Sequence, residues 1–121
     1  MGKTSNIEIK VTLDDQRVPE KLEWSAEEGS ERLNQAKAMM LAFWDGADKT
    51  ALRIDLWTKS MMVDEMADFF FQTMMTMADT YKRATPYHDM AEDLKQFANQ
   101  FYKKFQDKLK QEEAEAGQKG L

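Results

Sequence analysis

The stretch Leu52-Arg53-Ile54-Asp55-Leu56-Trp57 decides the fold of the middle of the chain, because apolar and polar side chains alternate along it. A period of two is typical of a strand with one buried face. Residues 36–44, just before it, are rich in Ala, Met and Leu, which favour helix. A turn at residues 46–50, however, brings three apolar pairs onto one face: Trp44 with Leu52, Ala42 with Ile54, and Met40 with Leu56. We therefore predict a hairpin, with a helix over residues 36–44 as the alternative.

The opposite face of this predicted hairpin is the candidate functional surface. It carries apolar and charged side chains together: Met39, Leu41, Phe43, Arg53, Asp55 and Trp57. A plain solvent-facing side of a sheet would carry mostly polar residues. We expect this surface to bind another protein or to form a homodimer interface, and coverage by the chain's own helices is the alternative.

An earlier hairpin is predicted from residues 7–13, where every odd position is apolar. The sequence Asp14-Asp15-Gln16-Arg17 favours a turn, since aspartates accept hydrogen bonds from the backbone that follows. Closing the hairpin there pairs Leu13 with Val18, Ile9 with Leu22 and Ile7 with Trp24, and leaves Val11 opposite Glu20. Pro19 cannot donate to a ladder, so an exposed edge is expected there. The polar residues 25–35 are expected to form a connection that holds at most a helical turn.

The second half of the chain changes to a helical period. Apolar residues at spacings of three and four predict a helix from Val63 to about Ala84, ended by Pro86. A second helix is predicted from His88 to about Glu113. The expected architecture is α+β, with a four-stranded antiparallel sheet of two hairpins followed by two antiparallel helices (ββββαα). We expect residues 1–111 to form a single domain and residues 112–121 a flexible tail.

Composition narrows the function classes. The 121 residues are 42% hydrophobic and carry a net charge of −5, which disfavours nucleic acid and anionic membrane as partners. The absence of cysteine excludes disulfides and thiol chemistry. No run resembles a signal peptide or a membrane span, so a cytoplasmic location is expected.

No catalytic or metal-binding constellation is apparent, and no cofactor motif occurs. The single histidine, His88, is expected in the first turn of a helix, and Asp45 and Asp48 are expected in a turn. Arg53 and Asp55 are expected to form an ion pair. We therefore expect a non-enzymatic protein; the weaker alternative is an enzyme that uses Arg53, Asp55 and Glu65.

Methionine is unusually frequent, with ten in the chain. Methionine fills irregular gaps in a core, and it also forms adaptable binding surfaces. Because the chain also has seven phenylalanines, some of these side chains are expected to remain on a surface. A different functional hypothesis follows: a hydrophobic-ligand or chaperone-like carrier with a Met/Phe-lined pocket between sheet and helices.

Several stretches of the chain are familiar from one protein family. The most specific is Leu-Arg-Ile-Asp-Leu-Trp-Thr at residues 52–58; the others lie at residues 18–26, 36–41, 43–45, 63–66, 69–70, 72–73, 77–80 and 83–85. Through these stretches the chain resembles the gliding-motility-associated GldC family of Bacteroidetes. Met62 and Phe71 depart from the family pattern, where proline and histidine are expected. The resemblance implies a small cytoplasmic accessory protein of the gliding machinery, without catalytic residues, and leaves its molecular role open. Our leading hypothesis is a protein-interaction module, with a component of the gliding machinery as the candidate partner.

Overall fold

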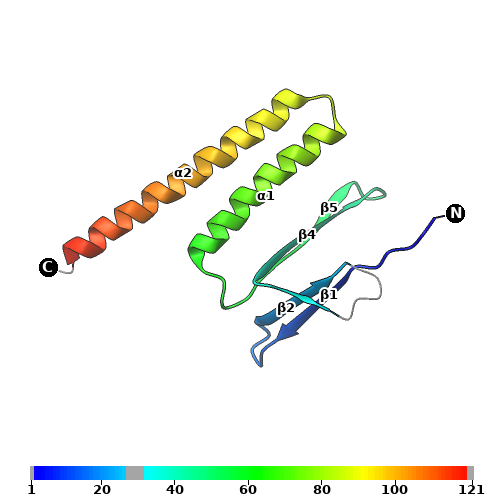
Figure 1. The fold of residues 1–121 in the computed structure, drawn as a ribbon, viewed down its shortest axis with the longest axis horizontal. Coiled ribbons are helices and arrows are strands. Elements are labelled where there is room, and N and C mark those ends of the chain that lie inside the picture. Colours follow the sequence, from blue (N-terminus) through cyan, green and yellow to red (C-terminus); the bar gives the residue numbers. More distant parts are fainter. Residues whose placement is uncertain (1, 27–31, 120–121) are drawn as a thin grey trace. The chain divides into compact units, whose positions relative to one another are not determined.

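A computed structural model describes residues 2–26 and 32–119, with the side chains of residues 118 and 119 left aside. The chain divides into two compact units, Met1–Met62 and Val63–Leu121, and each is described by itself. The first contains the strands and the second the helices (Figure 1). The α+β class predicted from the sequence is confirmed.

The first sheet has three antiparallel strands: β1 (Glu8–Leu13), β2 (Pro19–Ser25) and β3 (Asn34–Ala36), in that order. The first hairpin is therefore confirmed, but its register differs from the prediction by two residues. Apolar pairs now run along one face: Ile9 with Trp24, Val11 with Leu22, and Leu13 with Pro19. Leu22, at 2% exposure, is the best-buried large side chain of this sheet. The predicted mismatch of Val11 with Glu20 was wrong, because an irregularity between Thr12 and Leu13 shifts the pairing.

The turn between β1 and β2 depends on Asp14. Its carboxylate accepts hydrogen bonds from the backbone N–H of Gln16 at 2.8 Å and of Val18 at 2.9 Å. Arg17 takes a positive φ of 62°, which completes the turn. Lys59 forms an ion pair with the same carboxylate and is the main cause that lowers the pKa of Asp14, with the Val18 bond second. Asp14 therefore links the turn to the segment that follows the last strand.

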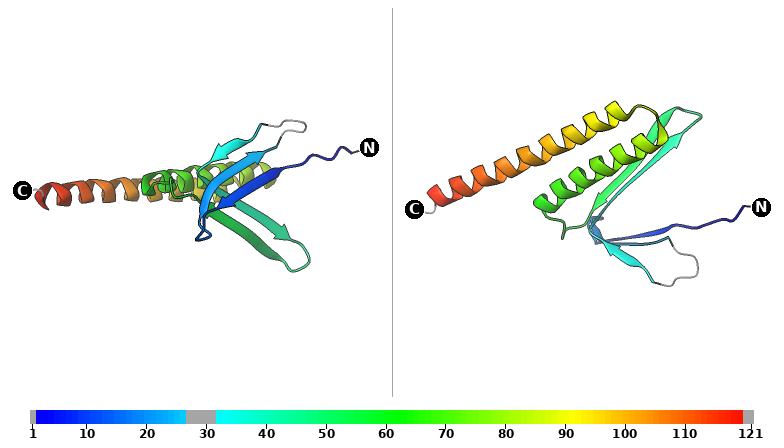
Figure 2. Two further views of the ribbon diagram at one scale, coloured as in Figure 1. Left: turned by 90° about the horizontal axis from the view of Figure 1, so that it is seen from below. Right: turned by 45° about the horizontal axis from the view of Figure 1, so that its top comes forward.

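The second sheet is a two-stranded hairpin of β4 (Ala38–Asp45) and β5 (Thr50–Trp57) (Figure 2). The strand prediction for residues 36–44 is confirmed over the helical alternative from Ala38 onward. The predicted register was wrong by one residue, because the turn is shorter than expected: Asp45 pairs with Thr50. The Asp45 carboxylate accepts bonds from the N–H of Ala47 and Asp48, and Lys49 closes the turn at a φ of 52°.

A single four-stranded sheet was the wrong prediction, and β3 is the reason. This short strand, which falls in the predicted connection, occupies the second edge of β2, so β4 cannot pair there. The chain bends at Lys37 and starts a separate sheet. The Lys37 carbonyl accepts bonds from the backbone N–H of Thr58 at 2.8 Å and from its hydroxyl at 2.9 Å. Thr58 is buried at 4% exposure, so this contact ties the end of β5 to the bend.

The helical unit is an antiparallel pair of α1 (Val63–Ala84) and α2 (His88–Lys119). Both predicted starts are confirmed, as is the end of α1. Buried alanines let the helices approach closely: Ala67, Ala78, Ala91 and Ala98. Phe70 stacks on Phe101, and Phe71 contacts Tyr102 with ring centroids 4.8 Å apart.

The last helix is longer than expected, because it continues to Lys119 instead of about Glu113. Its 32 residues span about 48 Å, against about 33 Å for the 22 residues of α1. All residues from 106 to 117 are exposed. The single-domain assignment of residues 1–111 and the flexibility of the tail stay predictions.

Candidate functional site

The β4–β5 hairpin has one face that is entirely apolar. Residues directly opposite in an antiparallel pair share a face. The register pairs Met39 with Leu56, Leu41 with Ile54, and Phe43 with Leu52. We call these six residues the apolar face.

The apolar face is only partly covered. Phe43 is 58% exposed, Leu52 53% and Ile54 50%, while Met39, Leu41 and Leu56 are intermediate. Single exposed apolar residues are ordinary, but a contiguous set on one strand pair marks an interaction site. At one end of the face, Leu56 lines a hollow together with Val18 and Pro19 of the first sheet, whereas Phe43 and Leu52 form the more exposed end.

The opposite side of the hairpin, the mixed face, combines apolar and charged residues: Ala38, Met40, Ala42, Trp44, Ala51, Arg53, Asp55 and Trp57. Arg53 donates two hydrogen bonds to Asp55, at 3.0 and 3.2 Å, so the predicted ion pair is confirmed. Hydrogen bonding to Asp55 and the negative charge of Asp55 raise the pKa of Arg53. Both groups are exposed, so this pair contributes little to stability.

The structure divides the predicted candidate surface between these two faces. Met39, Leu41 and Phe43 lie on the apolar face, whereas Arg53, Asp55 and Trp57 lie on the mixed face. Their placement on one face was wrong, because a one-residue change of register moves a whole strand's side chains to the other side. The role of these residues in partner binding stays a prediction.

Sequence reasoning placed Leu52, Ile54 and Leu56 opposite the wrong residues of β4. A signal for the correct register is present in Asp45, whose side chain can bond its following backbone and so favours a short turn. The positive φ of Lys49 could not be predicted from the sequence, because lysine is not typical of that conformation.

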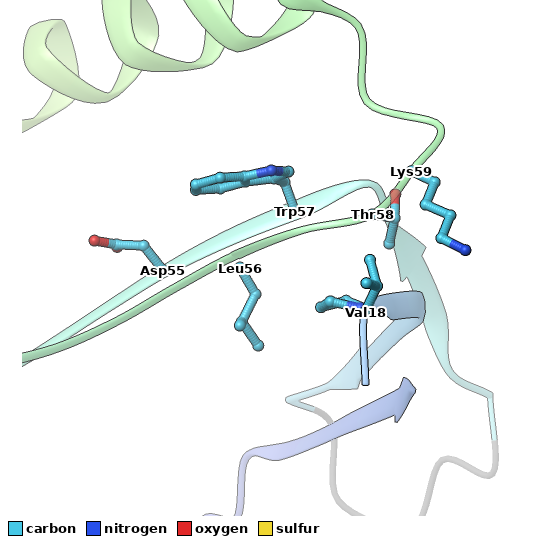
Figure 3. Close-up of a pocket in the computed structure, with 7 residues that line it drawn as sticks. Val18, Asp55, Leu56, Trp57, Thr58 and Lys59 are labelled. Carbon is cyan, nitrogen blue, oxygen red and sulfur yellow. The ribbon is translucent and has the colours of Figure 1, made fainter. Parts of the chain in front are cut away.

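Two hollows lie where the first sheet meets the end of β5. One, of about 330 Å³, is lined by Val18, Pro19, Asp55, Leu56, Trp57, Thr58 and Lys59. Figure 3 shows that Leu56 and Trp57 project from opposite sides of β5, with Leu56 on the side of Val18. The other, of similar volume, is lined mainly by polar residues: Glu20, Lys21, Leu22, Gln35, Ala36, Lys37, Thr58 and Ser60. Neither contains the Met and Phe side chains expected for a carrier pocket.

The remaining candidate residues have structural positions. His88 is exposed at the start of α2, as predicted, and Asp45 accepts the predicted turn bonds. Glu65 lies in the first turn of α1.

Over residues 2–26 and 32–119, no helix is long and apolar enough to cross a membrane. The same part of the chain holds no group of three His, Asp or Glu residues arranged for a metal ion.

Comparison with known proteins identifies the family. No curated protein and no solved structure matches this chain. The family described as gliding motility-associated protein GldC-like matches residues 19–107, which include β2 to β5, all of α1 and most of α2. The match therefore includes both faces of the β4–β5 hairpin, and the chain belongs to the GldC-like family of gliding motility-associated proteins.

Proposed function

We propose that this protein is a non-enzymatic accessory component of the gliding motility machinery that acts by binding another protein of that machinery in the cytoplasm. The apolar face of the β4–β5 hairpin is the binding surface. The observation that carries the proposal is the exposure of Phe43, Leu52 and Ile54 on that face, each at 50% or more. Family membership supplies the association with gliding.

The chemistry of the described residues supports a binding role. Arg53 and Asp55, two residues of the enzyme alternative, are hydrogen-bonded to each other and exposed. A carboxyl that acts as a general acid near neutral pH has its pKa raised by its surroundings, as in an apolar pocket. The pKa values of Asp14 and Asp79 are instead lowered, chiefly by bonds from Lys59 and Lys95. The hollow beside Leu56 contains no Met or Phe side chain, so it does not support the carrier alternative.

The test compares two neighbouring residues of β4. Phe43 lies on the apolar face and Trp44 on the mixed face, and both are more than half exposed. We expect Phe43→Asp to abolish or strongly slow gliding when it replaces the natural residue in cells, because a charge cannot be buried in an apolar interface without a partner. Trp44→Asp is the matched control and is expected to leave gliding largely intact.

Protein level and the circular dichroism spectrum of both variants are measured in parallel. A photo-crosslinking residue at position 43 should capture a gliding-machinery protein, and the same residue at position 44 should not. Equal gliding defects at similar protein levels, or no defect from Phe43→Asp, would contradict the assignment of the apolar face.

A further inference from the structure

The outer edge of β5 is eight residues long, and no described strand pairs with it. Among the residues that the structure describes, β5 pairs only with β4, so its sheet has two strands. An isolated two-stranded sheet is marginally stable in water, and an exposed apolar edge invites a further strand. β5 has eight residues and contains no proline or lysine, two residue types that commonly protect a strand edge, and its only charged residues are Arg53 and Asp55.

The sequence of β5 is complementary to itself about Ile54. On either side of Ile54 stand first the opposite charges Arg53 and Asp55, and then Leu52 and Leu56. In an antiparallel pair of two such strands centred on Ile54, every neighbour is matched. Ile54 meets its own copy, Arg53 meets Asp55, Leu52 meets Leu56, and Ala51 meets Trp57. Apolar pairs and opposite charges are the cross-strand combinations that stabilise sheets.

We propose that two copies of this chain pair antiparallel through the outer edges of β5, with a two-fold axis at Ile54. The contact is isologous, since the same strand serves both copies, and such two-fold dimers are the commonest oligomers. It converts two hairpins into one four-stranded sheet in which each Arg53 faces the Asp55 of the other copy. The proposal rests on the edge of β5 and stands independently of the partner that the apolar face binds.

A consequence is that the two apolar faces merge. Directly opposite residues share a face, so Ile54 and Leu52 of one copy lie beside Ile54 and Leu56 of the other. The dimer then presents twice the set of six apolar side chains that one copy holds. The mixed faces merge on the other side, where the charge pairs form.

Charge reversal at the paired positions tests the register. Arg53→Asp places two acids opposite each other at both symmetry-related pairs, and Asp55→Arg places two bases there. We expect each single variant to weaken dimerisation about tenfold or more, because both pairs change from attraction to repulsion. Mixing the two single variants should restore a dimer, since every cross-strand pair is then opposite in sign. Sedimentation velocity over a concentration series measures both effects.

The first sheet provides the matched control for this experiment. Glu8 and Lys10 on β1 form the same kind of pair, two residues apart and 3.6 Å between charged atoms. Lys10→Glu makes a similar change of charge at an edge that belongs to a three-stranded sheet. It is expected to leave the dimer intact, and a dimer that dissociates on Lys10→Glu but not on Arg53→Asp would overturn the proposal.

A cysteine scan tests the position of the two-fold axis without relying on charge. The natural chain has no cysteine. Ile54→Cys is expected to form a disulfide-linked dimer under mild oxidation, because its Cβ atom meets that of the other copy at roughly 4.5–5.5 Å, within reach after a small adjustment. Leu52→Cys lies on the same face with similar exposure but about 13 Å from its own copy, so it should not cross-link.

The outcomes are decisive. A dimer that is weakened by each single charge reversal, restored by mixing, and cross-linked at position 54 but not 52 supports the proposal. A protein that stays monomeric at all concentrations, or a dimer in which Leu52→Cys cross-links as well as Ile54→Cys, overturns it.

Discussion

The helical pair and the β4–β5 hairpin are both antiparallel two-element units. They differ in how completely each forms its backbone hydrogen bonds and buries its apolar side chains. The helices form their backbone bonds internally and meet through buried alanines and two pairs of contacting aromatic rings. In the part of the chain that the structure describes, the outer edge of β5 has no pairing strand, and the apolar face of the hairpin is half exposed. Helix pairing can therefore be completed within one chain, whereas a two-stranded sheet leaves backbone N–H and C=O groups and apolar surface available to another strand or another protein.

The largest effect is expected in the first sheet, from Leu22→Ala. This side chain is 2% exposed in β2, and its loss should lower the free energy of unfolding by about 2–5 kcal/mol. Urea unfolding measures the change, with Leu52→Ala in β5 as the matched control. That residue is 53% exposed, so in dilute protein its replacement should change stability by about 0.5 kcal/mol or less. Equal losses would mean that β5 is as well packed as β2.

A somewhat smaller effect is expected where the helices touch. Ala98 is fully buried, and Ala98→Leu should destabilise the protein by about 1–3 kcal/mol, because the added atoms force the helices apart. Ala114→Leu makes the same change at an exposed position of α2 and should have almost no effect. Thermal unfolding followed by circular dichroism compares them. Tolerance of leucine at position 98 would show that the helix pair is not closely packed.

The Asp14 turn predicts a pH dependence. Because the bond from Lys59 lowers its pKa in the folded protein, Asp14 stabilises the fold above the unfolded pKa, near 3.9. This contribution is lost as pH falls through the lower, folded pKa. Asp14→Asn should therefore lose less stability than the natural protein when urea unfolding at pH 7 is compared with pH 2. Asp15→Asn, an equal change of charge next to it, should behave like the natural protein; identical pH dependence in all three would contradict the account.

The smallest effect is expected from removing the end of α2. Residues 106–117 are exposed, and α2 is longer than α1. Truncation after Glu112 should lower the free energy of unfolding by less than about 0.5 kcal/mol, because the side chains of residues 113–117 are exposed. A loss above about 2 kcal/mol would show that this segment packs on the rest of the protein.

The sequence predicted the elements better than their pairing. The helical period placed Val63–Ala84 as the structure has it, since spacing along one helix is a local property. The alternation at residues 52–57 identified β5 correctly and overruled the helical propensity of residues 38–44. Register failed because it depends on turn length, which Asp45 and Lys49 set through backbone geometry.

The candidate site was predicted only in part, because the same error in register affects it. All six of its predicted residues lie on the β4–β5 hairpin, but the one-residue shift placed half of them on the wrong face. β3 was missed because Asn34-Gln35-Ala36 is short and polar, with no alternation to detect. Thr58 was missed because its buried bonds to Lys37 join residues 21 positions apart, which no local pattern reports.

Amide hydrogen exchange across a protein concentration series shows directly whether a second copy of the chain pairs with the edge of β5. If the edge of β5 is completed by a second copy, amides within residues 51–57 should exchange more slowly as concentration rises, while those of α1 and the middle of α2 stay unchanged. Protection of β5 that is independent of concentration, or protection that rises equally in the helices, would contradict it.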